Sequence, residues 1–177
     1  GISWTQQTLS GVLNWRRICC SSDRTKLAAC VYGGYIYTSD NSGTSWPQRT
    51  GSGSRNWSGI CCSSDRTKLA ACVFGGYIYT SDDSGETWTE RTSAGSSNWS
   101  RITCSSDGIK LITGEDTGYV YISNDFGNTW TQQTNVGDRK WYNFTSSSDG
   151  TKLAACVYGG YIYTAESSKE NIKNISL

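Results

Sequence analysis

The sequence predicts an all-β protein built from four repeats of about 42 residues each, a period that indicates a repeat architecture. The stretch from Cys19 to Asp40 occurs again from Cys61 to Asp82 with one difference, Tyr32 against Phe74. Within a repeat the apolar residues alternate with a period of two, which is typical of strands. Four short strands per repeat are typical of a β-propeller blade. The tryptophans that open the repeats are evenly spaced along the chain: Trp15, Trp57, Trp99 and Trp141.

The first repeat shows how the strands are expected to follow one another. Residues 15–20 and 27–32 are apolar-rich runs separated by a turn-like segment. Residues 35–38 are rich in strand-favouring side chains, and residues 45–50 form a fourth run before a Gly/Ser loop. No stretch combines helical periodicity with helix caps, which excludes a helical solenoid. The turns favour antiparallel hairpins over a β-helix.

The two ends of the chain are predicted to complete one blade. Trp4 stands one repeat length before Trp46, so residues 2–8 are expected to form a fourth strand, which the last repeat lacks. Pairing within one chain would close a four-bladed propeller, whereas pairing between chains would build a larger ring or a filament. The expected organisation is one domain over residues 1–166, followed by a tail at 167–177. Its blades are residues 15–50, 57–92, 99–134, and 141–165 together with 1–9.

A turn motif recurs between the third and fourth strands. SDNSGTSW at residues 39–46 becomes SDDSGETW at 81–88 and SNDFGNTW at 123–130. These segments resemble the Asp-box, S-x-D-x-G-x-T-W, of the Asp-box (bacterial neuraminidase repeat) β-propeller family. We expect a structural role, in which a short side chain accepts turn N–H groups and a glycine takes a backbone shape that other residues resist. The residues expected in these roles are Asn41, Gly43, Asp83, Gly85, Asp125 and Gly127.

The resemblance to sialidases does not extend to a catalytic set. Sialidases of this family need a larger propeller, an arginine triad and a Tyr/Glu pair. The arginines here occupy equivalent positions of different repeats, which favours repeated structural roles over one convergent site. The sequence contains no histidine, which excludes His-based catalysis and imidazole-dependent metal sites. We expect no catalytic residue, no metal and no cofactor.

The cysteines occupy repeat positions that predict bridges between blades. Pairing the second position of one repeat with the first position of the next leaves no partner missing, and Gly114 then faces Ser146. Two-residue turns of the type seen at Asp107-Gly108 set a hairpin register that places Cys30 opposite Arg17. The predicted disulfides are Cys30–Cys62, Cys72–Cys104 and Cys156–Cys20.

The alternative for the cysteines is that they are small residues packed between blades, which we expect for Cys19 and Cys61. Disulfides would indicate an oxidising compartment. Asn56 and Asn98 lie in N-x-S sequons beside Gly/Ser loops and are glycosylation candidates. Both features point to an extracellular or cell-surface protein.

The formal net charge of +1 gives no electrostatic reason to expect nucleic acid or a membrane surface as partner. No apolar run approaches the roughly 20 residues of a membrane helix. We expect a non-catalytic extracellular scaffold that assembles with copies of itself through its terminal strands. The alternative is a lectin that binds glycans at repeated sites. Its candidate sugar-stacking residues, which could equally fill the core between blades, are Trp15, Trp57, Trp99 and Trp141.

Overall fold

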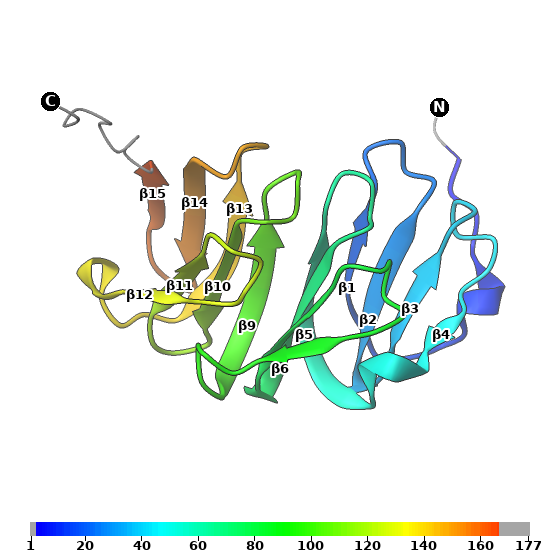
Figure 1. Cartoon of the computed structure of the whole chain (residues 1–177), viewed down its shortest axis with the longest axis horizontal. Coiled ribbons are helices and arrows are strands. Elements are labelled where there is room, and N and C mark those ends of the chain that lie inside the picture. Colours follow the sequence, from blue (N-terminus) through cyan, green and yellow to red (C-terminus); the bar gives the residue numbers. More distant parts are fainter. Residues whose placement is uncertain (1–2, 167–177) are drawn as a thin grey trace, which may run out of the picture.

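The computed structural model describes residues 3–166, which fold into consecutive antiparallel sheets (Figure 1). We number these sheets as units 1 to 4. Unit 1 contains β1 (Trp15–Cys20), β2 (Leu27–Gly34), β3 (Ile36–Ser39) and β4 (Gln48–Arg49). Unit 2 contains β5 (Arg55–Cys62), β6 (Leu69–Gly76), β7 (Ile78–Ser81) and β8 (Thr89–Arg91). Unit 3 contains β9 (Ser97–Cys104), β10 (Leu111–Glu115), β11 (Val120–Ser123) and β12 (Thr131–Gln133). Unit 4 contains β13 (Trp141–Ser146), β14 (Lys152–Val157) and β15 (Ile162–Glu166).

Each unit is a meander in which neighbouring strands of the sequence pair in order. The first strands of successive units, β1, β5, β9 and β13, lie against one another. Short ladders from β2 to β5 and from β6 to β9 join units 1 to 3 into one continuous sheet. Units 1 and 4 therefore lie at opposite ends of a row, as Figure 1 shows.

The strand order and the predicted hairpin register are confirmed for β1 and β2. Cys30 lies opposite Arg17, and Cys20 lies opposite Leu27. Every first strand has an irregular step directly after its tryptophan, as between Trp15 and Arg17. The fourth strands are shorter than expected, because the segment that follows each Asp-box turn pairs over only two or three residues.

The hydrophobic core lies between units. The cluster between units 1 and 2 joins Cys30 and Ile36 to Trp57 and Ile60, and two similar clusters join the later units. In each unit the tryptophan also packs edge-on against a tyrosine of the third strand, with ring centroids 5.0–5.4 Å apart. A single unit therefore buries its apolar faces only when a neighbour covers them.

Unit 1 shows what happens when that neighbour is missing. Ile60, Ile102 and Phe144 occupy one repeat position and are 5–7% exposed, because the preceding unit covers them. Ile18 holds the same position in unit 1 and is 61% exposed. At the other end, Ile162 is 76% exposed although its counterpart Ile36 is fully buried. The row of units thus ends in two uncovered apolar faces.

The predicted N-terminal strand is wrong for the part that the structure describes. Residues 3–7 form no strand, and Thr8–Ser10 is a 3-10 turn, η1. Trp4 is 95% exposed and pairs with no strand of unit 4. The segment packs instead on unit 1, where Gln7 approaches Gly43. Among residues 3–166, unit 4 is therefore a three-stranded sheet, and no described strand joins units 4 and 1. The predicted tail at 167–177 lies outside the described residues.

Replacing Trp57 by alanine should lower the free energy of unfolding by about 3–5 kcal/mol, because the fully buried indole fills the space between units 1 and 2. The matched control is Trp4→Ala, which removes an exposed indole and should change stability by less than about 0.5 kcal/mol. Urea unfolding followed by tryptophan fluorescence measures both. Equal losses for the two variants would contradict the placement of the core.

Candidate functional site

The three turns that resemble the Asp-box, which we call the Asp-box turns, are held by local hydrogen bonds. In unit 2 the Asp83 carboxylate accepts hydrogen bonds from the N–H (2.9 Å) and hydroxyl of Thr87, while Ser81 Oγ accepts the N–H of Gly85 (2.9 Å). Burial alone would raise the pKa of Asp83, but the hydrogen bonds from Thr87 outweigh it and lower that pKa. Gly85 has φ +91°, which favours glycine, and a Cβ there would approach Leu69.

The other two turns have the same hydrogen-bond pattern with small variations. Asn41 replaces the aspartate in unit 1, and its Oδ1 accepts the N–H of Ser45 at 2.9 Å. Asp125 accepts the N–H of Thr129 at 2.9 Å in unit 3. Gly43 and Gly127 have φ +89° and +81°. Of the six predicted turn residues, the three with side-chain oxygens thus accept local hydrogen bonds, and the three glycines provide the positive φ of the turn.

A second repeated turn lies between the first and second strands, in a segment that the sequence marks only as turn-like. Asp23 accepts hydrogen bonds from the hydroxyls of Ser21 and Thr25 and from the N–H of Thr25. These bonds, with Ser21 first, lower the pKa of Asp23 to about 2. The pKa of Asp65 in unit 2 is lowered to about 2 for the same reason. The available signal is the pattern S-S-D-x-x-K, which occurs in all four repeats.

These second turns link the units through a ladder of backbone hydrogen bonds. Ser22 N donates to Ser64 O, Ser64 N to Ser106 O, and Ser106 N to Ser148 O, each at 2.7 Å. The ladder has a direction, because each unit donates to the next. Within residues 3–166, Ser148 N has no acceptor and Ser22 O has no donor. Unit 4 therefore ends with a free donor and unit 1 begins with a free acceptor.

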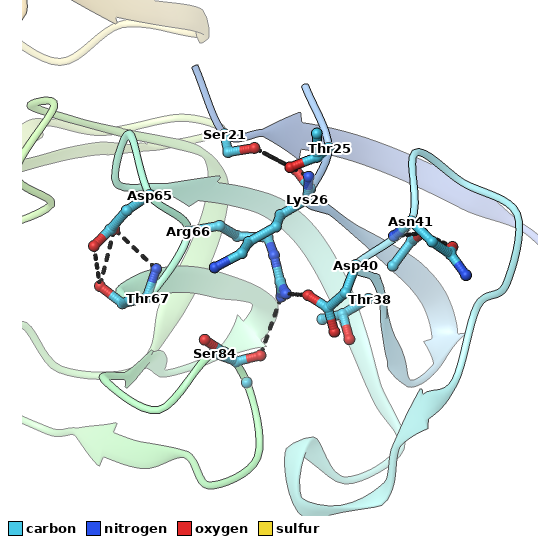
Figure 2. A network of polar contacts seen from close by, with 12 residues as sticks. Ser21, Thr25, Lys26, Thr38, Asp40, Asn41, Asp65, Arg66, Thr67 and Ser84 are labelled. Carbon is cyan, nitrogen blue, oxygen red and sulfur yellow. Dashed lines mark hydrogen bonds and ion pairs between the residues drawn. The ribbon is translucent and has the colours of Figure 1, made fainter. Parts of the chain in front are cut away.

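A charged side chain braces units 1 and 2. Arg66 lies in the second turn of unit 2 and is buried to 1% exposure. Its Nη2 forms an ion pair with Asp40 of unit 1, and its Nη1 donates to Ser84 O at 3.2 Å (Figure 2). A second ion pair between these units joins Arg49 to Glu86.

The predicted disulfides are wrong in this structure, where all eight cysteines are free thiols. The reason is the alignment of the units. Cys104 Sγ donates to Cys62 O at 3.2 Å, so equal repeat positions lie side by side. Cys62 is therefore level with Cys20, three strand residues or about 10 Å away from the level of Cys30, beyond the reach of a disulfide. The same offset applies to Cys72–Cys104, whereas Cys156 and Cys20 belong to units 4 and 1, at opposite ends of the row (Figure 1).

The thiols that do approach one another belong to other positions. A hydrogen bond from Cys19 lowers the pKa of the Cys62 thiol. Burial raises the pKa of Cys30 to about 12 and that of Cys72 to about 11. These buried thiols act as small packing residues.

The loss of cysteine at position 114 has a packing explanation. A Cβ on Gly114 would lie 2.4 Å from the ring of Phe144, whose counterparts in units 2 and 3 are the smaller Ile60 and Ile102. The larger ring in unit 4 therefore requires glycine where units 1 and 2 hold cysteine. The change at position 114 therefore compensates for the larger side chain at position 144 of the next unit.

The proposed sugar-stacking residues are mostly inaccessible. Trp57, Trp99 and Trp141 are buried, and only Trp15 is partly exposed, because unit 1 lacks a preceding unit. Stacking on a sugar needs an open indole face, so the structure gives no repeated lectin site at these residues. The sequon residues Asn56 and Asn98 are both exposed, at the starts of β5 and β9.

Among residues 3–166, no group of three or more His, Cys, Asp or Glu side chains is arranged to hold a metal ion. The helices in the same range are three-residue 3-10 turns, and none could cross a membrane.

Solved β-propeller structures resemble this chain. YCF48 bound to D1 peptide matches with a TM-score of 0.66 and 14% identity over 89% of this chain and 53% of YCF48. The likeness shows a propeller-type fold. An ancestral GH74 enzyme matches with a TM-score of 0.65 and 15% identity, over 89% of this chain and 25% of the enzyme. YCF48 from Cyanidioschyzon merolae matches with a TM-score of 0.61 and 13% identity, over 88% of this chain and 57% of that protein.

This propeller-type chain thus spans about half of the YCF48 structures and about a quarter of the GH74 enzyme. No protein-family model matches its sequence, and no curated protein does. The two ends of the row differ most from the regular repeats: unit 1 has an exposed face with the N-terminal segment on it, and unit 4 is three-stranded among the described residues.

The turn carboxylates should make stability depend on pH in the acid range. The pKa values of Asp23 and Asp65 are lowered to about 2, against about 3.9 in an unfolded chain. Their contribution is therefore complete above pH 4 and is lost as the pH falls towards 2. Asp65→Asn should flatten this dependence, whereas the control Asp138→Asn, at an exposed residue with no such turn, should not. Urea midpoints between pH 2 and 6 test this, and identical slopes for the two variants would contradict it.

Proposed function

We propose that this protein is a non-catalytic extracellular scaffold, a propeller of four blades per chain that assembles end to end with copies of itself. Units 1 to 4 are the blades in this proposal. The observation that carries it is the position of the N-terminal segment, which lies on blade 1 where the outer strand of a preceding blade would lie.

Repeat equivalence supports that assignment. Gln7 stands one repeat length before Arg49. Arg49 Cγ lies 3.8 Å from an ideal Cβ on Gly85 of the next unit, and Gln7 Cγ lies 3.6 Å from an ideal Cβ on Gly43. The 3-10 turn at Thr8–Ser10 likewise corresponds to the one at Thr50–Ser52. The segment therefore has the packing of an outer strand without the strand that should lie beside it.

The missing neighbour has a counterpart at the other end of the chain. In unit 1, Ile36 pairs with Arg49. The same register, carried forward by three repeats, pairs Ile162 in β15 with Gln7 of another copy. Such strand addition satisfies the backbone groups of an exposed edge and covers Ile162.

The remaining open groups are complementary in the same direction. The next copy would present Ile18 to the face of blade 4, as Ile60 is presented to blade 1. Burying this side chain stabilises the junction by about 1.5–3 kcal/mol. The free donor Ser148 N would meet the free acceptor Ser22 O and continue the ladder. A head-to-tail junction of this kind gives a ring if its rotation closes and a filament if it does not.

The extracellular part of the proposal now rests on the exposed sequons at Asn56 and Asn98, since the cysteines give it no support. The non-catalytic part rests on the lack of histidine and on the structural use of the Asp-box residues.

The full chain should form particles larger than its 19.4 kDa mass in a concentration-dependent way. Deletion of residues 1–9 or the substitution Ile18→Asp should shift it to the monomer, because each removes one half of the junction. Gln132→Asp, an exposed residue on β12 in the middle of the row, is the matched control and should assemble normally. Sedimentation velocity and light scattering measure the masses.

Two results would contradict the proposal: a 19.4 kDa particle at every concentration of the unmodified chain, or assembly that neither change at the ends reduces.

A further inference from the structure

The brace between units 1 and 2 provides a template for a junction between copies. Arg66 extends from the second turn of unit 2 to Asp40, which directly follows the third strand of unit 1. Figure 2 shows the guanidinium between Asp40 and Ser84 O, in contact with both units.

The backbone at this turn position is in the left-handed region in every unit. Units 3 and 4 use glycine there, with φ +74° at Gly108 and +65° at Gly150. Unit 2 keeps Arg66 at φ +58°, a conformation that strains a residue with a side chain. The ion pair with Asp40 explains why arginine is retained in unit 2 in spite of this strain.

Unit 1 keeps the same strain with no partner among the described residues. Arg24 has φ +62° and its N–H donates to Ser21 O, as the N–H of Arg66 donates to Ser63 O. Its side chain is exposed and forms no ion pair within residues 3–166. A strained arginine, held in the geometry of the brace but without an acid, points to a partner outside this copy.

The acid that fits stands at the far end of the row. The residues at the repeat position of Asp40 are Asp82, Asn124 and Glu166. Glu166 is exposed at the end of β15 and makes no ion pair in the described part of the chain, although Lys152 is its cross-strand neighbour. Unit 4 of one copy takes the place before unit 1 of the next in the assembly proposed above.

We propose that Arg24 of one copy forms an ion pair with Glu166 of a second copy, in the geometry of the Arg66–Asp40 brace. This inference rests on the proposed function. The sequence places arginine and acid together at the junction of units 1 and 2 and again at the junction of copies. At the other two junctions the acid or amide faces glycine: Asp82 with Gly108, and Asn124 with Gly150.

The pair would determine direction as well as strength. Only the face of unit 4 presents Glu166 and only the face of unit 1 presents Arg24, so like ends repel or leave a charge unpaired when they meet. Arg66 is fully covered by its neighbouring unit, and Arg24 would be covered in the same way, which makes its pairing worth more than that of an exposed ion pair.

The test is a charge swap in the full chain, with the assembly constant measured by sedimentation equilibrium. Arg24→Gly should weaken assembly by about tenfold or more while leaving the monomer as stable as before, because glycine relieves the strain at φ +62°. Glu166→Gln should weaken assembly by a similar factor. Arg24→Glu and Glu166→Arg should each weaken it further, and the double variant carrying both should regain most of the lost affinity.

Asp82→Arg is the matched control, because this acid holds the same repeat position but faces Gly108, and assembly should not change. If the unmodified chain assembles and Arg24→Gly and Glu166→Gln assemble equally well, the ion pair is refuted and the proposed function stands. Failure of the double variant to recover affinity also refutes the pair. If the unmodified chain does not assemble at all, the proposed function and the pair both fail.

Discussion

The structure depends on one constraint: each sheet unit can bury its apolar face only against the next unit. The three core clusters all lie between units, and the exposure of one repeat position follows directly from whether a preceding unit is present. Ile60, Ile102 and Phe144 are buried, and Ile18 is not, although the local sequence around Ile18 and Ile60 is nearly identical. Stability in such a row is a sum of unit and interface contributions, so each end unit lacks the contribution of one interface.

Polar contacts also join each unit to its neighbour. The serine ladder at the second turns runs in one direction, each unit donating to the next, and the Arg66–Asp40 brace crosses one interface in the opposite direction, from a donor in unit 2 to an acceptor in unit 1. The Asp-box and second turns hold their own loops through Ser, Asp and Thr side chains, and so fix the shape of the surface offered to the neighbour. The N-terminal segment contacts Gly43 through Gln7 as the outer strand of unit 1 contacts Gly85 through Arg49.

Local patterns in the sequence predicted the local structure well. Period-two alternation and glycine breaks located the strands, and the S-x-D-x-G-x-T-W pattern predicted the turn hydrogen bonds. The predicted register, Cys30 opposite Arg17, is correct, although the hydrogen bond from Arg24 N to Ser21 O centres the turn on Ser22 and Asp23 and not on Asp23 and Arg24. The disulfides failed because they depend on how far one unit is displaced along its neighbour, which no pattern within a repeat records. The pair Cys30 and Ile60 in units 1 and 2 is replaced by Gly114 and Phe144 in units 3 and 4. The sequence shows this replacement, but its cause is the volume available between two units, which only the structure shows. The prediction for the terminal segment failed because this segment packs on unit 1, away from every described strand of unit 4 that it was expected to pair with.

The account is tested most directly by asking what lies beside residue 7. A photoreactive amino acid in place of Gln7, in a mixture of ordinary and isotopically heavy chains, reports by mass spectrometry which chain each cross-link reaches. The account predicts cross-links from light to heavy chains at β15, close to Ile162, together with links inside one chain to the turn at Gly43. Links confined to a single chain under conditions where the protein is concentrated would contradict it.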